Sequence, residues 1–224
     1  MDSELLEQIS QREGVSKIEP RTKQFIEALE TKAPLYQVEL TPQAVERLSN
    51  YYELLNEWNS RLHLVAPTAP GEFAVRHVLE SLLLLQYLPE GARVADIGSG
   101  AGLPILPCLI SRADVEAILI EASKKKAVFL REALKQTSTS NQASVIADRF
   151  ENITAPDVDF VTCRALERFE KMLPTLVKWT PAKTTFLFFA GEGLVKEIQD
   201  CGLDSTAVLI PNSKRRFLVL ARKE

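Results

Sequence analysis

The chain has 224 residues, of which 46% are hydrophobic and 25% charged, as expected of a globular protein with a hydrophobic core. A formal net charge of −3 argues against a protein that binds nucleic acid indiscriminately through an overall basic surface. No apolar run approaches the roughly 18 residues that span a membrane, and three cysteines without paired spacing predict neither a disulfide framework nor a zinc site. We therefore expect a cytoplasmic protein with neither a metal centre nor a membrane partner.

Residues 1–90 are predicted to form a helical N-terminal extension. Residues 1–35 read as a mostly polar lead-in, helical or only partly ordered. The segment 41–58 opens with a Thr-Pro pair that suits a helix N-terminus, and its hydrophobic residues then recur at spacings of three and four. A second helix is predicted over 70–88, where a proline and a glycine follow it closely.

Residues 91–224 are predicted to form a Rossmann-like α/β domain. Strand-like segments alternate with helical ones, which predicts a mostly parallel sheet covered by helices on both faces. Only five residues join the last two strands, too few for a parallel crossover, so these two should form an antiparallel hairpin. The expected strands are 92–97, 115–121, 143–147, 158–163, 184–190, 206–210 and 216–221, with helices over 103–111, 124–136 and 166–179.

The segment VADIGSGAG follows the first strand and carries three glycines, Gly98, Gly100 and Gly102, after an acid, Asp96. In open α/β sheets, ligands bind at this edge. A phosphate would seek free N–H groups and positive charge, whereas this loop offers a nearby carboxylate and a proline two residues past its last glycine. A ligand without phosphates and with cationic groups fits better, and S-adenosylmethionine (SAM) carries both an ammonium and a sulfonium.

Acidic residues after the next two strands strengthen this interpretation. Glu121 ends the second strand, where an acid can hydrogen-bond two ribose hydroxyls. Phe150 and Glu151 follow the third strand, where they could flank an adenine and accept its amino group, and Asp148 competes for the second role. A nicotinamide-dependent dehydrogenase is disfavoured by Asp96 and by the proline of the loop.

Several stretches taken together resemble the RsmG (also called GidB) family, bacterial methyltransferases that act on guanine N7 in small-subunit ribosomal RNA. The resemblance covers roughly residues 45–221. The stretches that carry it are YYELLNEWNSRLHLVAP, VRHVLESLLLL, VADIGSGAGLPILPCLI, EASKKKAVFLREAL and TCRALERFEKML.

The resemblance implies a class I SAM-dependent methyltransferase with a helical N-terminal extension, acting on 16S ribosomal RNA or the small ribosomal subunit. It implies that Gly98 and Leu103 line the methionine and ribose side of the cofactor, and that Phe150 and Glu151 hold its adenine end. Arg164 corresponds to a family arginine beside cofactor and substrate, so we expect it to orient both. Because guanine N7 has a lone pair and no proton, no general base is expected.

The chain departs from the family pattern at Ala190, which stands where relatives usually carry a lysine before a glycine. This departure leaves two alternatives open. One is a SAM-dependent methyltransferase acting on another RNA, a protein or a small molecule. The other is a SAM-binding protein that associates with ribosomes without catalysis.

Two further groups of polar residues are candidates for a role near the site. His77 and Glu80 have the spacing of helical metal ligands, but a polar anchor that packs the helical extension near the site is the better interpretation. Basic residues gather at three places and predict a basic rim around the cofactor mouth: Lys124, Lys125, Lys126, Arg164, Arg168, Lys171, Lys214, Arg215 and Arg216.

Overall fold

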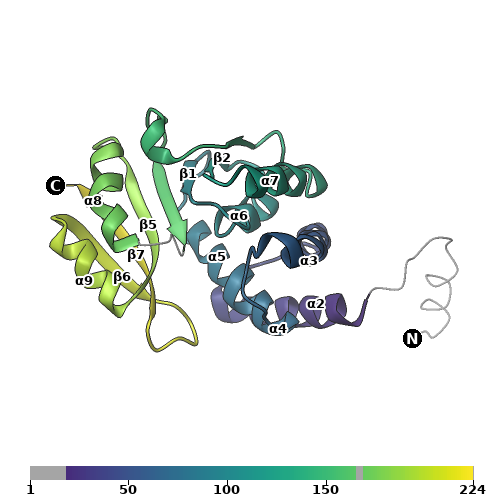
Figure 1. Cartoon of the computed structure of the whole chain (residues 1–224). Coiled ribbons are helices and arrows are strands. Elements are labelled where there is room, and N and C mark those ends of the chain that lie inside the picture. Colours follow the sequence, from purple (N-terminus) through teal and green to yellow (C-terminus); the bar gives the residue numbers. More distant parts are fainter. Residues whose placement is uncertain (1–18, 165–168, 224) are drawn as a thin grey trace, which may run out of the picture.

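The structure is a computed structural model that describes residues 19–164 and 169–223, the side chains of 169 and 170 excepted. A seven-stranded sheet lies at its centre, with strand order β3-β2-β1-β4-β5-β7-β6 (Figure 1). The strands are β1 (Arg93–Ile97), β2 (Glu116–Ile120), β3 (Ala143–Ile146), β4 (Phe160–Arg164), β5 (Thr185–Gly191), β6 (Leu203–Leu209) and β7 (Arg216–Lys223).

The strand pairing confirms the predicted sheet. β1 to β5 pair in parallel, and β7 runs antiparallel between β5 and β6. β1 is flanked by β2 on one side and by β4 on the other. The order in which successive strands are added to the sheet therefore changes direction at β1. The carboxyl end of β1 is therefore the point at which open sheets of this type bind ligands.

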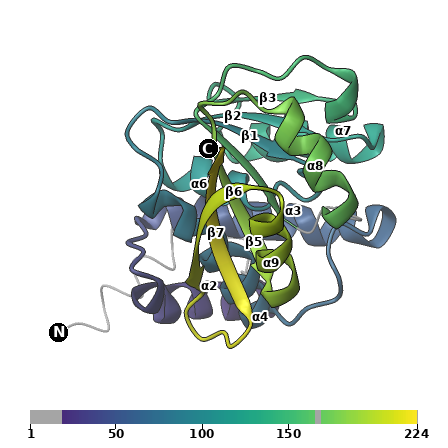
Figure 2. The same ribbon diagram turned by 90° about the vertical axis from the view of Figure 1, so that its left-hand side faces the viewer.

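Helices cover both faces of the sheet, and Figure 1 and Figure 2 show α8 and α9 on the side away from the N-terminal helices. Two hydrophobic clusters correspond to the two faces, one built with the N-terminal helices, α6 and α7, the other with α8 and α9. Successive strand residues alternate between them, as a pleated strand requires: Val94 belongs to the first cluster and Ala95 to the second. These helices are α6 (Ile105–Ser111), α7 (Lys124–Gln136), α8 (Phe169–Trp179) and α9 (Glu192–Asp200).

The N-terminal extension is helical as predicted, but its second helix is not regular. The helical run from residue 70 to 86 contains six π-helical residues and ends in a 3₁₀ turn. A π-helical segment is rare and is often found at functional sites. The elements are α2 (Pro20–Lys32), η1 (Ala33–Tyr36), α3 (Pro42–Leu62), α4 (Pro70–Phe73), η2 (Ala74–Leu79), α5 (Glu80–Leu82) and η3 (Leu83–Gln86).

Two elements differ from the sequence-based expectation. The helix α9 is not among the predicted elements, and two glycines that weaken a helical pattern, Gly191 and Gly193, lie at its start. The strand β6 begins at Leu203, three residues before the predicted 206, and its exposed residues obscure the alternation there. Residues 165–168, which the prediction assigned mainly to a helix, lie outside the described residues.

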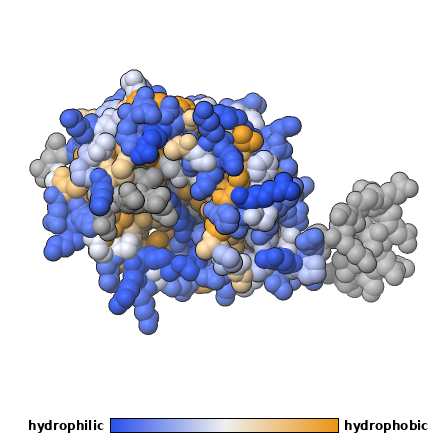
Figure 3. Space-filling view, viewed as in Figure 1, coloured by the Kyte–Doolittle hydropathy of each residue, from blue (hydrophilic) through white to orange (hydrophobic). Residues whose placement is uncertain are grey.

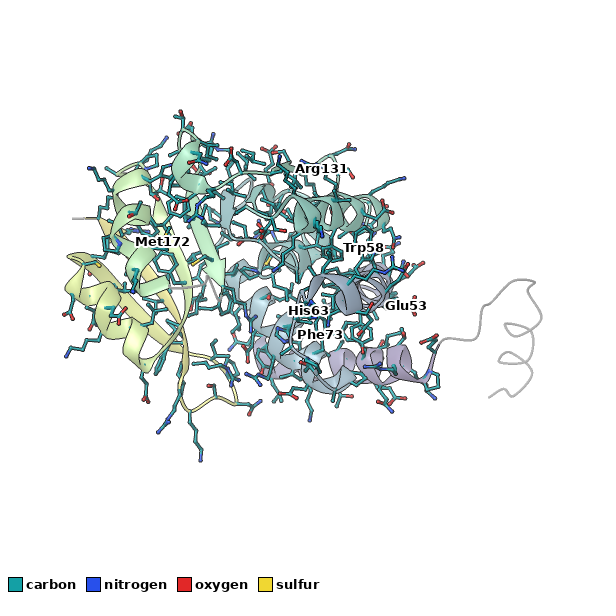
Figure 4. The ribbon with its side chains drawn as sticks, viewed as in Figure 1. Glu53, Trp58, His63, Phe73, Arg131 and Met172 are labelled. Carbon is teal, nitrogen blue, oxygen red and sulfur yellow. The ribbon has the colours of Figure 1, made fainter. Side chains whose placement is uncertain are left out.

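The described part of the N-terminal lead-in is packed more tightly than its polar composition indicated. Phe25 and Leu29 of α2 are fully buried. The Phe25 ring stacks on Tyr52 of α3, with ring centroids 4.4 Å apart. On another side of α3, Trp58 packs against Phe129 of α7, and Figure 4 shows Trp58 between these two helices. Aromatic contacts thus join α2 to α3 and α3 to the sheet domain.

The division of the chain into a helical extension, residues 1–90, and an α/β domain, residues 91–224, stays a prediction. One hydrophobic cluster contains side chains from both sides of that position, including Leu48 and Leu79 before it and Val94 and Leu106 after it. Within residues 19–164 and 169–223, no helix is both long enough and apolar enough to cross a membrane.

Replacing Phe25 with Ala tests whether α2 is part of the cooperative fold. The substitution removes a buried ring stacked on Tyr52, so we expect a loss of about 3–5 kcal/mol in the free energy of unfolding, measured with urea. Gln24→Ala, an exposed change on the same helix, is the control. If the two variants unfold within about 1 kcal/mol of each other, α2 is a separate appendage.

Candidate cofactor and acceptor site

The loop from Gly98 to Pro104 joins β1 to α6 and bends sharply over the end of β1. Its three glycines have positive φ values of 68°, 53° and 84°, which side chains with a Cβ rarely adopt. The amides of Gly98 and Ser99 both donate to the main-chain carbonyl of Ile120, at 2.8 and 3.2 Å. The loop is thereby fixed against the end of β2.

Gly102 is also constrained by packing. A Cβ added there would lie 3.1 Å from Leu106 Cβ and 3.4 Å from a methyl of Leu130. Its positive φ and this close approach together explain why glycine occupies the last position of the loop.

Asp96 lies beneath the loop and is fully buried. The Ser99 hydroxyl donates to the main-chain carbonyl of Asp96 at 2.9 Å, and neither carboxylate oxygen has a hydrogen-bond partner among the described residues. Burial raises the pKa of Asp96 to about 8, and the negative charge of Glu121 adds to this effect. A buried carboxylate without partners is costly in a native protein, so Asp96 is prepared for a cationic or donor-rich ligand.

Glu121 follows β2 and contacts the other side of the loop. One carboxylate oxygen accepts from the Gly100 amide at 2.8 Å and the other from the Ser123 amide at 2.7 Å. Ser123 in turn caps α7 by accepting from the Lys126 amide. The structure thus brings Asp96, the three glycines and Glu121 together in one constellation, as the sequence predicted.

The predicted adenine-flanking pair is placed differently. Phe150 belongs to the short helix η4 (Phe150–Asn152), is buried, and meets the edge of Trp179 with ring centroids 5.4 Å apart. Glu151 is exposed and pairs with Arg149 at 3.2 Å, whereas Asp148 accepts from Asn152. The Phe150 ring is therefore committed to the α8 face of the core, and the adenine roles of Phe150 and Glu151 stay predictions.

Sequence reasoning missed the contact between the helical extension and the loop. The hydroxyl of fully buried Tyr51, on α3, donates to the carbonyl of Ala101 at 2.8 Å. Tyr51 and the neighbouring Tyr52 are both buried in the core. No local signal identifies Ala101 as the hydrogen-bond partner, which lies 50 residues away.

Arg164, at the carboxyl end of β4, is held by a cluster of charged side chains. Its guanidinium lies 3.1 Å from one oxygen of Glu80, and Arg216 lies 2.7 Å from the other. Arg164 also donates to Ser81 and to the Arg76 carbonyl. Burial lowers the pKa of Arg164, and the charge of Glu80 opposes this effect. Glu80 is thus a polar anchor of the extension, as predicted, and the predicted contacts of Arg164 with cofactor and substrate stay a hypothesis.

His77, the other residue of the predicted anchor, lies on the π-helical segment against Phe73, with ring centroids 4.9 Å apart. Burial lowers the pKa of His77 to about 4, and the positive charge of Arg164 adds to this effect. The imidazole is therefore neutral at pH 7. No group of three His, Cys, Asp or Glu side chains in the described residues could hold a metal ion.

Two adjoining grooves lie away from this constellation. They have volumes of about 610 and 640 Å³, run along α2 and α3, and are both lined by Arg21, Tyr52 and Asn56. The candidate site is instead defined by side chains at the carboxyl edge of the sheet. Ala190, the predicted departure, is buried in β5 opposite Phe217.

SAM fits the constellation at the end of β1. The positive charges of its ammonium and sulfonium complement the unpartnered Asp96 carboxylate. Glu121 lies beside the loop, where it accepts a hydrogen bond from the Gly100 amide. The loop presents glycines where a large ligand must approach the main chain closely. The residues present therefore fit this cofactor better than they fit a dinucleotide.

The strand order and the glycine loop define a class I SAM-dependent methyltransferase fold. A SAM-dependent methyltransferase from Aquifex aeolicus is similar, with 17% identity and a TM-score of 0.53 over 76% of this chain and 97% of that one. The mitomycin 7-O-methyltransferase MmcR is similar at 12% identity, with a TM-score of 0.57 over 90% of this chain and 67% of that one. At these identities the likeness concerns the fold alone.

The chain belongs to the GidB family, described as rRNA small subunit methyltransferase G, whose model matches residues 44–210. The ribosomal RNA small subunit methyltransferase G of Sorangium cellulosum is 36% identical over 170 residues, 73% of this chain and 71% of that protein. The protein of the same name from Wolinella succinogenes is 32% identical over 191 residues, 85% of this chain and 96% of that protein. The family predicted from the sequence motifs is confirmed.

Replacing Asp96 with Asn tests the unpaired buried carboxylate. The pKa of Asp96 rises from 3.8 to about 8 on folding, so between these values the folded chain keeps a proton that the unfolded chain releases. This carboxyl therefore makes the ligand-free protein less stable as pH rises through that window. Urea unfolding should show D96N gaining at least about 1 kcal/mol on the wild type between pH 5 and pH 8.

The same substitution should weaken the binding of S-adenosylhomocysteine by about tenfold or more in calorimetry, because a charge-assisted contact to the ammonium is lost. Asp157→Asn is the control, since Asp157 is exposed and pairs with Arg93 and Lys183 instead. Equal affinities for the two variants would remove Asp96 from the cofactor site.

Proposed function

We propose that this chain transfers the methyl group of SAM to N7 of a guanine in 16S ribosomal RNA. The observation that carries the proposal is the family match over residues 44–210, which spans the second half of the helical extension, the glycine loop and the strands β1 to β6. Because ribosomal RNA is the proposed substrate, we place the reaction in the cytoplasm and name the RNA or the small ribosomal subunit as the partner.

The chemistry requires positioning more than acid–base catalysis. Bound SAM supplies an electrophilic methyl group on a sulfonium. Guanine N7 offers an in-plane lone pair and releases no proton on methylation, so the chain needs no general base. The environment of His77 agrees, because burial lowers its pKa to about 4 and so makes this imidazole a weak base at pH 7.

Each residue of the constellation then has a holding role in the proposal. Asp96 faces the cationic end of the cofactor, and Glu121 both shapes the loop and accepts from ribose hydroxyls. Leu103 lines the ribose side, and Phe150 and Glu151 border the adenine. Holding the two reactants in near-attack geometry supplies roughly 7–11 kcal/mol of barrier lowering.

One observation supports a second candidate, a methyltransferase with a different acceptor. Ala190 is buried at the position where the family pattern has a lysine, so the acceptor side lacks one cation that relatives bring. A non-catalytic SAM-binding protein that associates with ribosomes is the other alternative, and turnover distinguishes it.

Methylation assays separate these candidates. We expect the purified chain to transfer tritium from labelled SAM to small-subunit RNA, as naked RNA or as assembled subunits, isolated from a host in which the encoding gene is deleted. The label should map to one guanine by cleavage at 7-methylguanosine. Label on another base or on protein would support a different acceptor, and cofactor binding without transfer would support the non-catalytic alternative.

A modified RNA provides the control for the acceptor atom. In a transcript with 7-deazaguanine at the mapped position, a C–H group replaces N7 and no lone pair remains. We expect methyl transfer to this RNA to fall to background while RNA binding is kept. Continued transfer would contradict N7 as the acceptor.

A further inference from the structure

One buried carboxylate of the helical extension bridges two arginines from different strands. Glu80 is fully buried, and its two oxygens lie 3.1 Å from Arg164 and 2.7 Å from Arg216. Three formal charges therefore meet, two positive and one negative. Because one carboxylate balances only one guanidinium, the cluster keeps one surplus positive charge.

The topology places this cluster beside the glycine loop. Arg164 is the last residue of β4, next to β1, and pairs in register with Phe189 of β5. Arg216 begins β7 and faces Gly191 at the end of β5. Because β7 runs antiparallel, both arginines lie at the sheet edge where β1 ends. This edge is where the acceptor must approach the cofactor.

The two arginines are not equivalent. Arg164 has a side chain only 15% exposed, and its guanidinium also donates to Ser81 and lies over the Phe189 ring, 5.0 Å from the centroid. Arg216 has a side chain 38% exposed and a buried Nε without a hydrogen-bond partner among the described residues. Glu80 therefore fixes Arg164 as an internal support and holds Arg216 at the surface.

The surroundings of Arg216 favour an anionic ligand. Lys214 and Arg215 precede it on the turn before β7. The Arg215 side chain is 83% exposed, and its Nε makes a long contact of 4.0 Å with a carboxylate oxygen of Glu192. Hydrophilic side chains cover much of the face drawn in Figure 3. A phosphate of the RNA backbone carries a negative charge that complements the surplus, whereas the guanine base is neutral before methylation.

We propose that Glu80 is a positioning residue that presents Arg216 to a backbone phosphate next to the target guanine. This inference rests on the proposed function and deepens it, since it names the residue that docks the RNA at the acceptor edge. Arg216 binds the RNA directly, and Arg164 acts through Glu80 by fixing its carboxylate.

Replacing Arg216 with Gln tests the phosphate contact. We expect KM for the RNA to rise about tenfold, while kcat and the Kd of S-adenosylhomocysteine stay within about twofold. The slope of log KM against log salt concentration should become shallower by about 0.7–1, because one phosphate contact is lost. Arg216→Lys keeps the charge and should recover most of the salt dependence.

The matched control is Arg222→Gln, which removes the same charge from β7 at the opposite edge, where Arg222 contacts Thr185. We expect this variant to match the wild type in KM and in salt dependence. If R216Q and R222Q have the same RNA KM and the same salt slope, Arg216 does not bind the RNA.

Replacing Glu80 with Gln tests whether Glu80 positions Arg216, because the two possible roles of Glu80 change KM for the RNA in opposite directions. The variant raises the local positive charge by one, so a carboxylate that only balances charge would yield tighter RNA binding with unchanged kcat. If Glu80 positions Arg216, KM for the RNA should instead rise about tenfold, as in R216Q, while S-adenosylhomocysteine binds as before. If E80Q fails to unfold cooperatively, R216Q and its control decide the proposal.

The wild-type chain, assayed on the same RNA, separates this inference from the proposed function. If the wild type methylates the RNA and R216Q behaves like R222Q, only the phosphate contact is refuted. If the wild type transfers no methyl group, the proposed function fails, and RNA affinity measured by fluorescence anisotropy still tests Arg216 on its own.

Discussion

The ion pairs of the Glu80 carboxylate are the interaction on which the placement of the helical extension against the sheet depends. It comes from the helical extension and pairs with arginines from β4 and β7, which are 84 and 136 residues further along the chain. Removing one partner of a buried ion pair typically costs about 3–5 kcal/mol, because the remaining charge stays buried. Together with the hydrogen bond from Tyr51 to Ala101, this pairing makes the extension one wall of the site.

Asp96 shows the opposite solution to burying a carboxylate. Glu80 is compensated twice, whereas Asp96 has no partner for either oxygen among the described residues and its pKa is raised to about 8. This contrast separates a carboxylate that organises the structure from one that is kept ready for a ligand.

In the proposed function, the site as a whole holds the reactants in place and moves no proton. The glycines admit a ligand close to the main chain, and Glu121 fixes the loop through the amides of Gly100 and Ser123. His77 is neutral at pH 7 and half-buried. Such a site suits transfer to an atom that already has a free lone pair, and it explains why no nucleophile or general base stood out in the sequence.

The sequence by itself determined the alternating strands and helices, the antiparallel hairpin and the loop from Asp96 to Gly102, because local periodicity, a short connector and glycine spacing encode them. The helix α9 has glycines at its start, which weaken a helical pattern, so the local sequence does not indicate it. Only the tertiary structure decided that Arg164 pairs with Glu80 and that the Phe150 ring packs on Trp179. These contacts join segments far apart along the chain, so packing of whole elements selects them and no local pattern records them.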